Sequence, residues 1–410
     1  MLLSLAIRNL RRNVRRTLLT VTAIALGLAM MVFVTSMQKG TYGSMIKSGV
    51  ASTTGHVVVE QATYVDNPQA TEGVSGAQAI ADALGAAIPD ATIAQRSLVD
   101  GLLSSANGAV GVQLRGVQPS VEPLVDTLPD KLVSGEWLQD DDSRGVILGE
   151  LLAESLDVDI GDRVVYQGNH NGEDYSELLR VRGTFKTGSA DIDGFMGVVP
   201  LQTAQKLVGM SDFANQVTVH LPDVAGTEAA TIAARTALGT LPEGVVVLPW
   251  QESMPNIVAS IEADRAGGVL MMVFLGLIVA MGIVNTVLMS VMERVREFGV
   301  LMAIGVRNRR IAAMVLLEAG VLGLLAALLG LVGGLLLAAP FIVNGLDMAA
   351  LAGGSMEMEG VVLDSIIFFS IDTPRLIVLA IVTVVVTVSA ALYPAWTVIK
   401  LKPLEALNSV

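Results

Sequence analysis

The sequence predicts a membrane protein with four transmembrane α-helices and a large α+β extracytoplasmic domain between the first and second spans. The chain has 410 residues, of which 52% are hydrophobic and only 16% charged, whereas a soluble protein carries about a quarter charged residues. Four segments hold the excess of apolar residues, and a long stretch of ordinary polarity separates the first two. Basic residues gather beside these segments.

Each apolar segment is long enough to cross a bilayer, which takes about 20 apolar residues. The predicted transmembrane helices are 17–38, 266–292, 311–343 and 376–399. Three of them contain no charged residue, and the third contains one, Glu318. The first follows a basic start, but its apolar region exceeds that of a cleaved signal peptide. We therefore expect an uncleaved anchor.

The basic residues beside the spans predict the orientation, because Lys and Arg there favour the cytoplasmic side. They are Arg8, Arg11, Arg12, Arg15 and Arg16 before the first span, Arg294, Arg296, Arg307, Arg309 and Arg310 before the third, and Lys400 and Lys402 after the fourth. One topology fits all three clusters. Residues 1–16 form an amphipathic helix on the inner membrane face, and 293–310 and 400–410 are also cytoplasmic. Residues 39–265 and the loop 344–375 face outward.

The predicted outer domain is acidic, with 30 Asp and Glu side chains against 13 Lys and Arg. This balance argues against binding to nucleic acid or anionic headgroups, and it is typical of a soluble domain kept solvated by charge. Strand-like and helix-like segments alternate in the same order within 50–119 and 211–250. We expect these two flanks to build one α+β subdomain, interrupted by a β-rich insert over 120–210.

Motifs of common enzymes are absent from the sequence. No phosphate-binding G-x-x-x-x-G-K-[ST], H-E-x-x-H or G-x-S-x-G pattern occurs, so we expect a chain without catalytic residues. It has no cysteine, and His56, His170 and His220 are far apart in the sequence. Clusters of ligands, not lone histidines, mark metal sites, so we expect no metal. The acidic "DIGD" segment at 159–162 is typical of a plain turn around glycine.

The segment 292–310, "MERVREFGVLMAIGVRNRR", places a charged helix between two apolar spans. Val295, Phe298, Leu301 and Met302 recur at helical spacing and form an apolar ridge. The ridge favours a helix that inserts into a partner protein, and a plain polar hairpin is the alternative. Glu318 follows in the third span, where it either bonds a neighbouring helix or senses motion of this cytoplasmic helix.

Several segments resemble the MacB/FtsX-type ABC permeases, closest to the lipoprotein-releasing Lol branch. "MERVREFGVLMAIG" is similar to their coupling helix, whose pattern is E-R-x-R-E-[IF]-G-x-[LM]-x-A-[IL]-G, although Met302 stands where arginine is common. The residues that match the coupling helix are Glu293, Arg294, Val295, Arg296, Glu297, Phe298, Gly299, Leu301, Met302 and Gly305. "YPAWTVIKLKPLEALNSV" resembles the C-terminal ending of the family through Pro394, Pro403 and Glu405. The N-terminus, the third span with Glu318, and 180–209 are also similar.

The resemblance implies a permease without cofactors of its own, in the cell inner membrane. Such permeases form dimers, with themselves or a paralogue, and bind two separate ATPase subunits that hold ATP and Mg. They relay ATP hydrolysis to the periplasmic domain by mechanotransmission. Three functions stay open: lipoprotein release, MacB-like export of peptides or small molecules with a periplasmic adaptor, and FtsX-like activation of a cell-wall hydrolase. The periplasmic loop 344–375 contains Met348, Met356 and Met358, which we expect to help form an entrance for lipid-anchored cargo.

Overall fold

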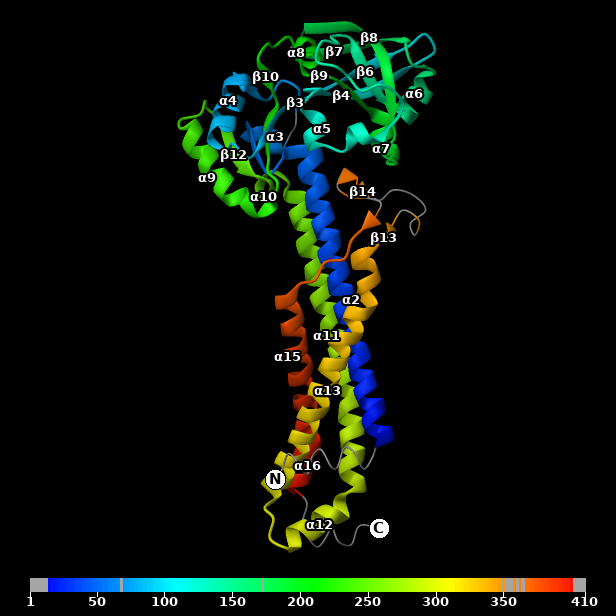
Figure 1. The fold of residues 1–410 in the computed structure, drawn as a ribbon, viewed down its shortest axis with the longest axis vertical. Helices are drawn as coiled ribbons and strands as arrows, with labels where there is room; N and C mark the ends of the chain where they lie inside the picture. The colour runs from blue at the N-terminus through cyan, green and yellow to red at the C-terminus, as the bar shows by residue number, and fades with distance from the viewer. Residues whose placement is uncertain are drawn as a thin grey trace. The chain divides into compact units, whose positions relative to one another are not determined.

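The computed structural model describes residues 14–66, 69–170, 173–348, 350, 357–358, 361–362 and 366–400, and the chain divides into two compact units (Figure 1). We call 1–42, 262–346 and 367–410 the helical unit, and 43–261 with 347–366 the sheet unit. Most of the predicted N-terminal amphipathic helix, the C-terminal tail after Lys400, Met356, Pro403 and Glu405 lie outside the described residues.

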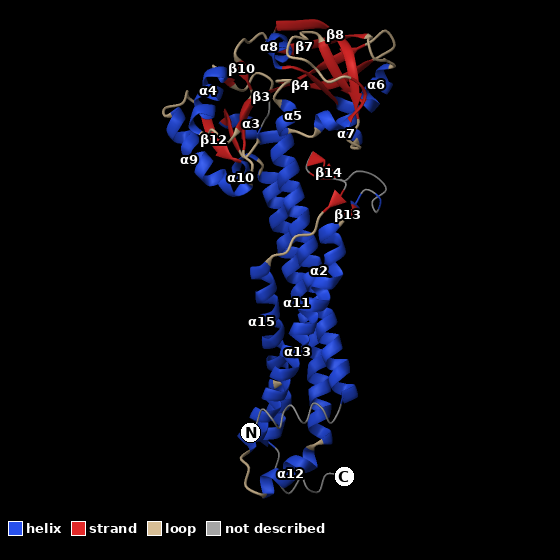
Figure 2. Cartoon of the chain, viewed as in Figure 1, coloured by secondary structure: helices blue, strands red, loops and turns tan. Residues whose placement is uncertain are grey.

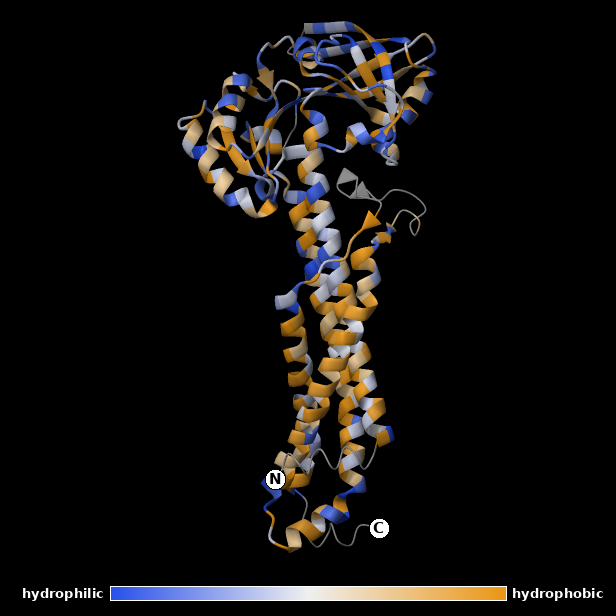
Figure 3. Cartoon of the chain, in the orientation of Figure 1, coloured by the Kyte–Doolittle hydropathy of each residue, from blue (hydrophilic) through white to orange (hydrophobic). Residues whose placement is uncertain are grey.

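Four long apolar helices are present in the described part of the chain, as the sequence predicts, and hydrophobic residues make up most of their length (Figure 3). They are α2 (Val14–Gly49), α11 (Pro255–Glu293), α13 (Asn308–Val343) and α15 (Thr373–Ala390), the last followed by α16 (Leu392–Lys400). At 1.5 Å per residue, the 36 residues of α2 extend about 54 Å. A helix of this length exceeds the ~30 Å hydrocarbon core, so α2 continues well beyond the predicted span.

Small residues bring α13 close to α2. A Cβ atom added at Gly334 would lie 2.5 Å from Val32 Cβ, and one at Gly330 would lie 2.8 Å from Leu28 Cβ. Glycines four residues apart stand on one face of a helix and let two backbones approach closely. The pair therefore fixes the packing of α13 on α2.

The first part of the sheet unit is an antiparallel four-stranded sheet with the order β12-β1-β11-β3. Its elements follow the chain as β1 (Val57–Gln61), α4 (Ala77–Ala87), β3 (Thr92–Ser104), β11 (Gln216–His220), α9 (Thr227–Leu238) and β12 (Val245–Pro249). Both flanks of the outer segment thus contribute a strand–helix–strand unit, which is a ferredoxin-like arrangement. Helices α4 and α9 pack on the same sheet (Figure 2).

The second part is a closed ring of strands that shares β3 with the first. Strand β3 pairs with β4, and the ring continues through β9, β6, β8 and β7 back to β3. The strands are β4 (Ala109–Val117), β6 (Gly145–Gly149), β7 (Arg163–His170), β8 (Glu173–Phe185) and β9 (Met196–Pro200). Strand β4 thus pairs with β9 in the ring, although the sequence grouped it with the flanks. The ring encloses a core of Val, Leu and Tyr166.

The remaining elements are short, and their bounds complete the fold. They are η1 (Val50–Thr54), α3 (Ala62–Asp66), β2 (Val74–Ser75), α5 (Glu122–Val125), η2 (Leu128–Lys131), β5 (Leu132–Gly135), α6 (Glu150–Leu156), α7 (Ala190–Phe195), α8 (Leu201–Val208), β10 (Phe213–Ala214), η3 (Val224–Gly226), α10 (Trp250–Ser253), α12 (Val295–Ala303), β13 (Leu346–Asp347), β14 (Glu357–Met358), β15 (Val361–Val362) and β16 (Ile366–Ile367). The "DIGD" segment is a turn, in which Asp159 N donates to Asp162 Oδ2.

Two histidines that are distant in the sequence are neighbours in the sheet unit. Pairing of Val57 with Val219 sets His56 beside His220 on adjacent strands, and both side chains are buried. Burial, followed by the nearby charge of Arg96, lowers the pKa of His220 to about 2. Burial also lowers the pKa of His56. Among the described residues, no three His, Cys, Asp or Glu side chains gather to hold a metal ion.

We predict that Gly334→Ala destabilises the helical unit. The new methyl group would overlap the Val32 side chain, and such overpacking costs about 1–3 kcal/mol. Thermal unfolding of the purified chain in detergent should show a lower midpoint. Gly282→Ala in α11 is the control, because no atom lies within 4 Å of its added Cβ. Equal midpoints for the two variants would contradict this packing role.

We predict that acid destabilises the sheet unit through His220. Its folded pKa lies below the unfolded value, so between these pKa values the unfolded chain binds more protons. Stability from this group is present above pH 6.5 and declines as the pH falls, by up to about 1.4 kcal/mol per pH unit. Unfolding midpoints measured from pH 7.5 to 5.0 should fall less steeply for His220→Gln than for the unmodified chain. Parallel slopes would exclude this contribution.

Candidate functional site

The candidate site is the loop between α11 and α13, which contains the short helix α12. Glycine ends this helix: Gly305 has φ +95°, its N–H donates to Met302 O, and Val306 N donates to Leu301 O. Two such bonds around a left-handed residue satisfy the last helix carbonyls and turn the chain sharply. The sequence "AIG" therefore ends α12 and directs the chain into α13.

The apolar ridge of α12 faces the helices of its own chain. Phe298 is 1% exposed, and Val295 and Met302 are also buried, in a core that includes Val21 of α2 and Val398 of α16. From the sequence we expected this ridge to insert into a partner protein. Instead, Phe298 is buried within its own chain and is not exposed as an anchor for a partner. The same spacing that predicts an amphipathic helix leaves open which protein its apolar face contacts.

The opposite face of α12 is open and carries both charge and apolar groups. Glu293, Arg296 and Glu297 are exposed, and so are Val300 (50%) and Ile304 (72%). From Arg296 to Ile304, these residues recur every three or four positions and share one side of α12, whereas Glu293 is the last residue of α11. Val300 and Ile304 are site residues that were not predicted from the sequence. Their signal was present, since they follow Arg296 and Glu297 at helical spacing.

An ion pair between buried Arg294 and partly buried Glu318 connects the start of α12 to α13. Arg294 Nη1 lies 3.2 Å from Glu318 Oε2, and Arg294 Nε lies 3.3 Å from Glu297 Oε2. The guanidinium carbon is also 5.2 Å from the centre of the Phe298 ring, a distance at which a cation and an aromatic ring attract. Glu318 thus bonds a group at the end of the neighbouring helix, and any shift of α12 against α13 disturbs this pair.

The C-terminal family motif is described in part. Pro394 is buried in α16, which begins at Leu392, two residues after α15 ends at Ala390. Proline has no N–H to donate to a carbonyl four residues earlier, which accounts for the break. Asn308 Nδ2 donates to Ile399 O at 3.0 Å and ties the start of α13 to α16. Pro403 and Glu405 lie outside the described residues.

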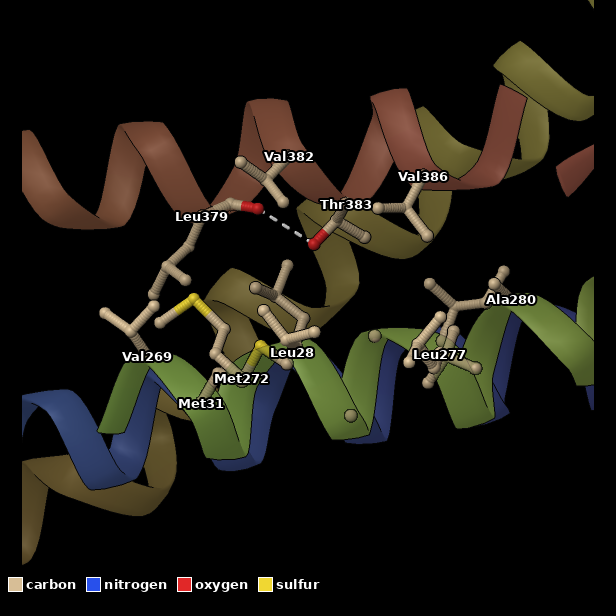
Figure 4. Close-up of a pocket in the computed structure, with 15 residues that line it drawn as sticks. Leu28, Met31, Val269, Met272, Leu277, Ala280, Leu379, Val382, Thr383 and Val386 are labelled. Carbon is tan, nitrogen blue, oxygen red and sulfur yellow. Dashed lines mark hydrogen bonds between the residues drawn. The ribbon is translucent and has the colours of Figure 1, made fainter. Parts of the chain in front are cut away.

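A separate apolar groove runs between α2, α11 and α15 in the helical unit (Figure 4). It has a volume of about 320 Å³. Leu28, Met272, Leu277 and Leu379 are among the side chains that line it, and Thr383 supplies a hydroxyl that donates to Leu379 O. The groove thus offers a hydrocarbon-like surface.

The methionines predicted at a cargo entrance lie in the sheet unit. Met348 is half-buried, and Met358 belongs to β14, which pairs with β15. Met356 lies outside the described residues. Their role stays a prediction.

Family models match most of the chain. A model of the MacB-like periplasmic core domain matches residues 17–237, and a model of the FtsX-like permease C-terminal region matches residues 269–403. The chain belongs to the MacB/FtsX-type ABC transporter permeases.

Relatives of this permease include proteins named LolC and a protein named MacB. The lipoprotein-releasing system transmembrane protein LolC of Neisseria meningitidis is 23% identical over 416 residues, which covers 96% of this chain and 94% of that protein. LolC of Xylella fastidiosa is 25% identical over 313 residues, 72% of each chain. The macrolide export ATP-binding/permease protein MacB of Brucella melitensis is 26% identical over 355 residues, 81% of this chain and 52% of that protein.

We predict a measurable coupling energy between Arg294 and Glu318 in this permease. Removing one partner leaves the other buried without its charge partner, so each of Arg294→Gln and Glu318→Gln should lower the unfolding midpoint. The double variant should lose less than the two single losses combined, with a coupling of about 1 kcal/mol or more. A double-mutant cycle in detergent measures it. Additive losses would mean that the two side chains do not interact.

Proposed function

We propose that this chain is the permease subunit of an ABC transporter that releases lipoproteins from the inner membrane. A separate ATPase subunit binds ATP and Mg, and the permease relays its hydrolysis to the periplasmic domain by mechanotransmission. The sheet unit acts as that periplasmic domain, and the active assembly contains two permease chains, identical or paralogous, with two ATPase subunits. ATP drives release only if it favours one of two arrangements of this assembly.

The observation that carries the proposal is the two-sided character of α12. Its inner face is held in the helical core by Phe298 and Arg294. Its outer face presents Val300 and Ile304, bordered by exposed charges. Exposed apolar groups with a charged rim are typical of a protein contact site. A force applied by a partner to the outer face is therefore delivered to α13 through contacts that are already packed.

Lipoproteins are the preferred cargo for two reasons. The LolC relatives, which are named as parts of lipoprotein-releasing systems, match along most of this chain. The groove between α2, α11 and α15 is almost wholly apolar, which suits the hydrocarbon chain of a lipid anchor. Export of a small molecule is the second candidate, and the macrolide-export relative favours it. Lipoprotein release and macrolide efflux, each assayed in proteoliposomes, distinguish the two.

We predict that Val300→Asp with Ile304→Asp releases the ATPase without unfolding the permease. Both side chains are exposed in this chain, so the two substitutions leave the helical core intact. A carboxylate at either position would be costly to desolvate on binding a partner protein. Because central apolar anchors contribute about 2 kcal/mol or more each, ATPase recovered with tagged permease should fall at least about tenfold. Cargo release should be lost with it.

The control for this pair is Leu124→Asp, because Leu124 on α5 has the same 72% exposure as Ile304. It should leave ATPase recovery unchanged. Phe298→Ala is expected to behave differently from the α12 surface variants. It empties a buried site, so it should lower the unfolding midpoint of the permease itself, at a cost of about 3–5 kcal/mol. Wild-type ATPase recovery by the Val300/Ile304 variant would refute the contact.

A further inference from the structure

The end of α2 lies in the sheet unit and needs polar partners for its last carbonyls. Helix α2 ends at Gly49 and continues as one π-helical turn, η1, which Gly55 terminates at φ +66°. The last carbonyls of a helix have no partner within it, and they form the negative end of its dipole. Gly55 N–H satisfies the carbonyl of Val50. The carbonyls of Ala51 and Thr53 require donors from elsewhere.

Arg96 supplies both donors. It projects from β3, is 3% exposed, and donates from Nη2 to Ala51 O at 2.8 Å and from Nη1 to Thr53 O at 2.9 Å. The planar guanidinium holds its donors in a fixed fork. Two bonds from one rigid group fix the position of the turn as well as its hydrogen bonding.

The other edge of this guanidinium is fixed to the sheet unit by acids. Glu122 Oε1 of α5 accepts from Arg96 Nη2 at 2.8 Å, and Glu122 Oε2 accepts from Nε at 3.4 Å. Asp126 lies 3.8 Å from Arg96 and 3.3 Å from Arg115 of β4. The charges of two arginines and two acids in this cluster thus neutralise one another. Arg96 bridges α5 on one side and the helix end on the other.

Stability alone does not account for this cluster. Replacing a buried ion pair by packed apolar side chains is often neutral or stabilising, because desolvation offsets the attraction. What an apolar group cannot provide is a directional bond to a carbonyl. The end of α2 is also closely packed, since a Cβ at Gly49 would lie 2.9 Å from Ile257 Cδ1 of α11. The junction therefore combines tight packing with bonds of defined direction.

We propose that Arg96 is a positioning residue that joins the end of α2 rigidly to β3 and α5. A movement of α2 is then passed to β3 and α5, because the end of the helix stays hydrogen-bonded and does not unwind. The inference rests on the proposed function, because it names the joint through which hydrolysis reaches the periplasmic domain.

The test replaces Arg96 together with Glu122, so that neither is left as a buried, unpaired charge. Arg96→Met with Glu122→Gln removes both bonds to the helix end and the acid that faces them. The matched control is Arg115→Met with Asp126→Asn, which removes a pair from the same cluster together with the 3.8 Å contact of Asp126 with Arg96, but leaves Glu122 and both bonds to the helix end. Within the described residues, Arg115 donates to Asp126 and to no carbonyl of α2 or η1. Both double variants perturb the domain, but only one releases the helix.

Two measurements are made on the full chain with its co-purified ATPase. Hydrogen exchange should become about tenfold faster at the amides of residues 50–56 in the Arg96/Glu122 variant, since a charge-assisted bond protects that turn. The control should change them less than about twofold. In proteoliposomes, lipoprotein released per ATP hydrolysed should fall about tenfold in the first variant, while ATP hydrolysis and ATPase binding persist. The control should keep most of this ratio.

Equal losses of release per ATP in both double variants would overturn the proposal, because a general weakening of the domain would then explain them. Unchanged exchange at residues 50–56 in the Arg96/Glu122 variant would also overturn it. If the unmodified assembly releases no cargo on ATP hydrolysis, the proposed function fails, and the exchange measurement alone still decides whether Arg96 holds the helix end. Partial recovery of both measurements in Arg96→Lys would support the role, since lysine keeps the charge but not the fork.

Discussion

Long apolar helices require polar partners at their ends, and that constraint governs two charged centres in the described part of the chain. A membrane helix satisfies its own backbone along its length, but its last carbonyls and the charged residues that follow it have no such partners. An arginine supplies these polar contacts at two helix ends. Arg96 donates to carbonyls where α2 ends, and Arg294 pairs with Glu318 where α11 gives way to α12. Each is buried and held by acids from another element.

Buried charge at these points favours defined geometry over stability. An ion pair removed from water gains little over apolar packing, and apolar residues are abundant in this chain. Arg294 lies at the start of a short helix and Arg96 contacts a helix end, and each bonds to an acid from a neighbouring element. The glycines of α13 make a contact without charge, because Gly330 and Gly334 let the backbone of α13 approach α2 closely. Packing thus holds helix to helix, and charge holds helix ends to their neighbours.

The sequence predicted the elements better than their partners. Four long apolar segments predict four long helices, and the repeated strand–helix–strand order predicts elements of both flanks. Helices α2 and α11 run past the predicted spans because polar residues beside a span can remain helical, which hydropathy does not register. The pairing of β4 with β9 is a contact between distant residues that alternation cannot specify. Phe298 fits the apolar ridge predicted for α12, but its burial in the same chain depends on where α13 and α16 lie. Arg96 gave one signal, a basic side chain within a strand-like run that also contains Asp100.

If a partner moves α12, as we propose, these contacts determine which helix receives the motion. The buried face of α12 and the Arg294–Glu318 pair join it to α13, and the two glycines join α13 to α2. Helix α2 is continuous to Gly49 and its final turn is held by Arg96. Coupling is carried by packed side chains and hydrogen-bonded networks that are contiguous, and this succession of contacts has no unpacked step. Helix α11 is different, since it is little covered by its own chain and no atom lies near an added Cβ at Gly276 or Gly282. Under the proposed function, a displacement of α12 would therefore be passed to α13 and then to α2, whose end Arg96 holds, while α11 has a face that the described residues leave uncovered.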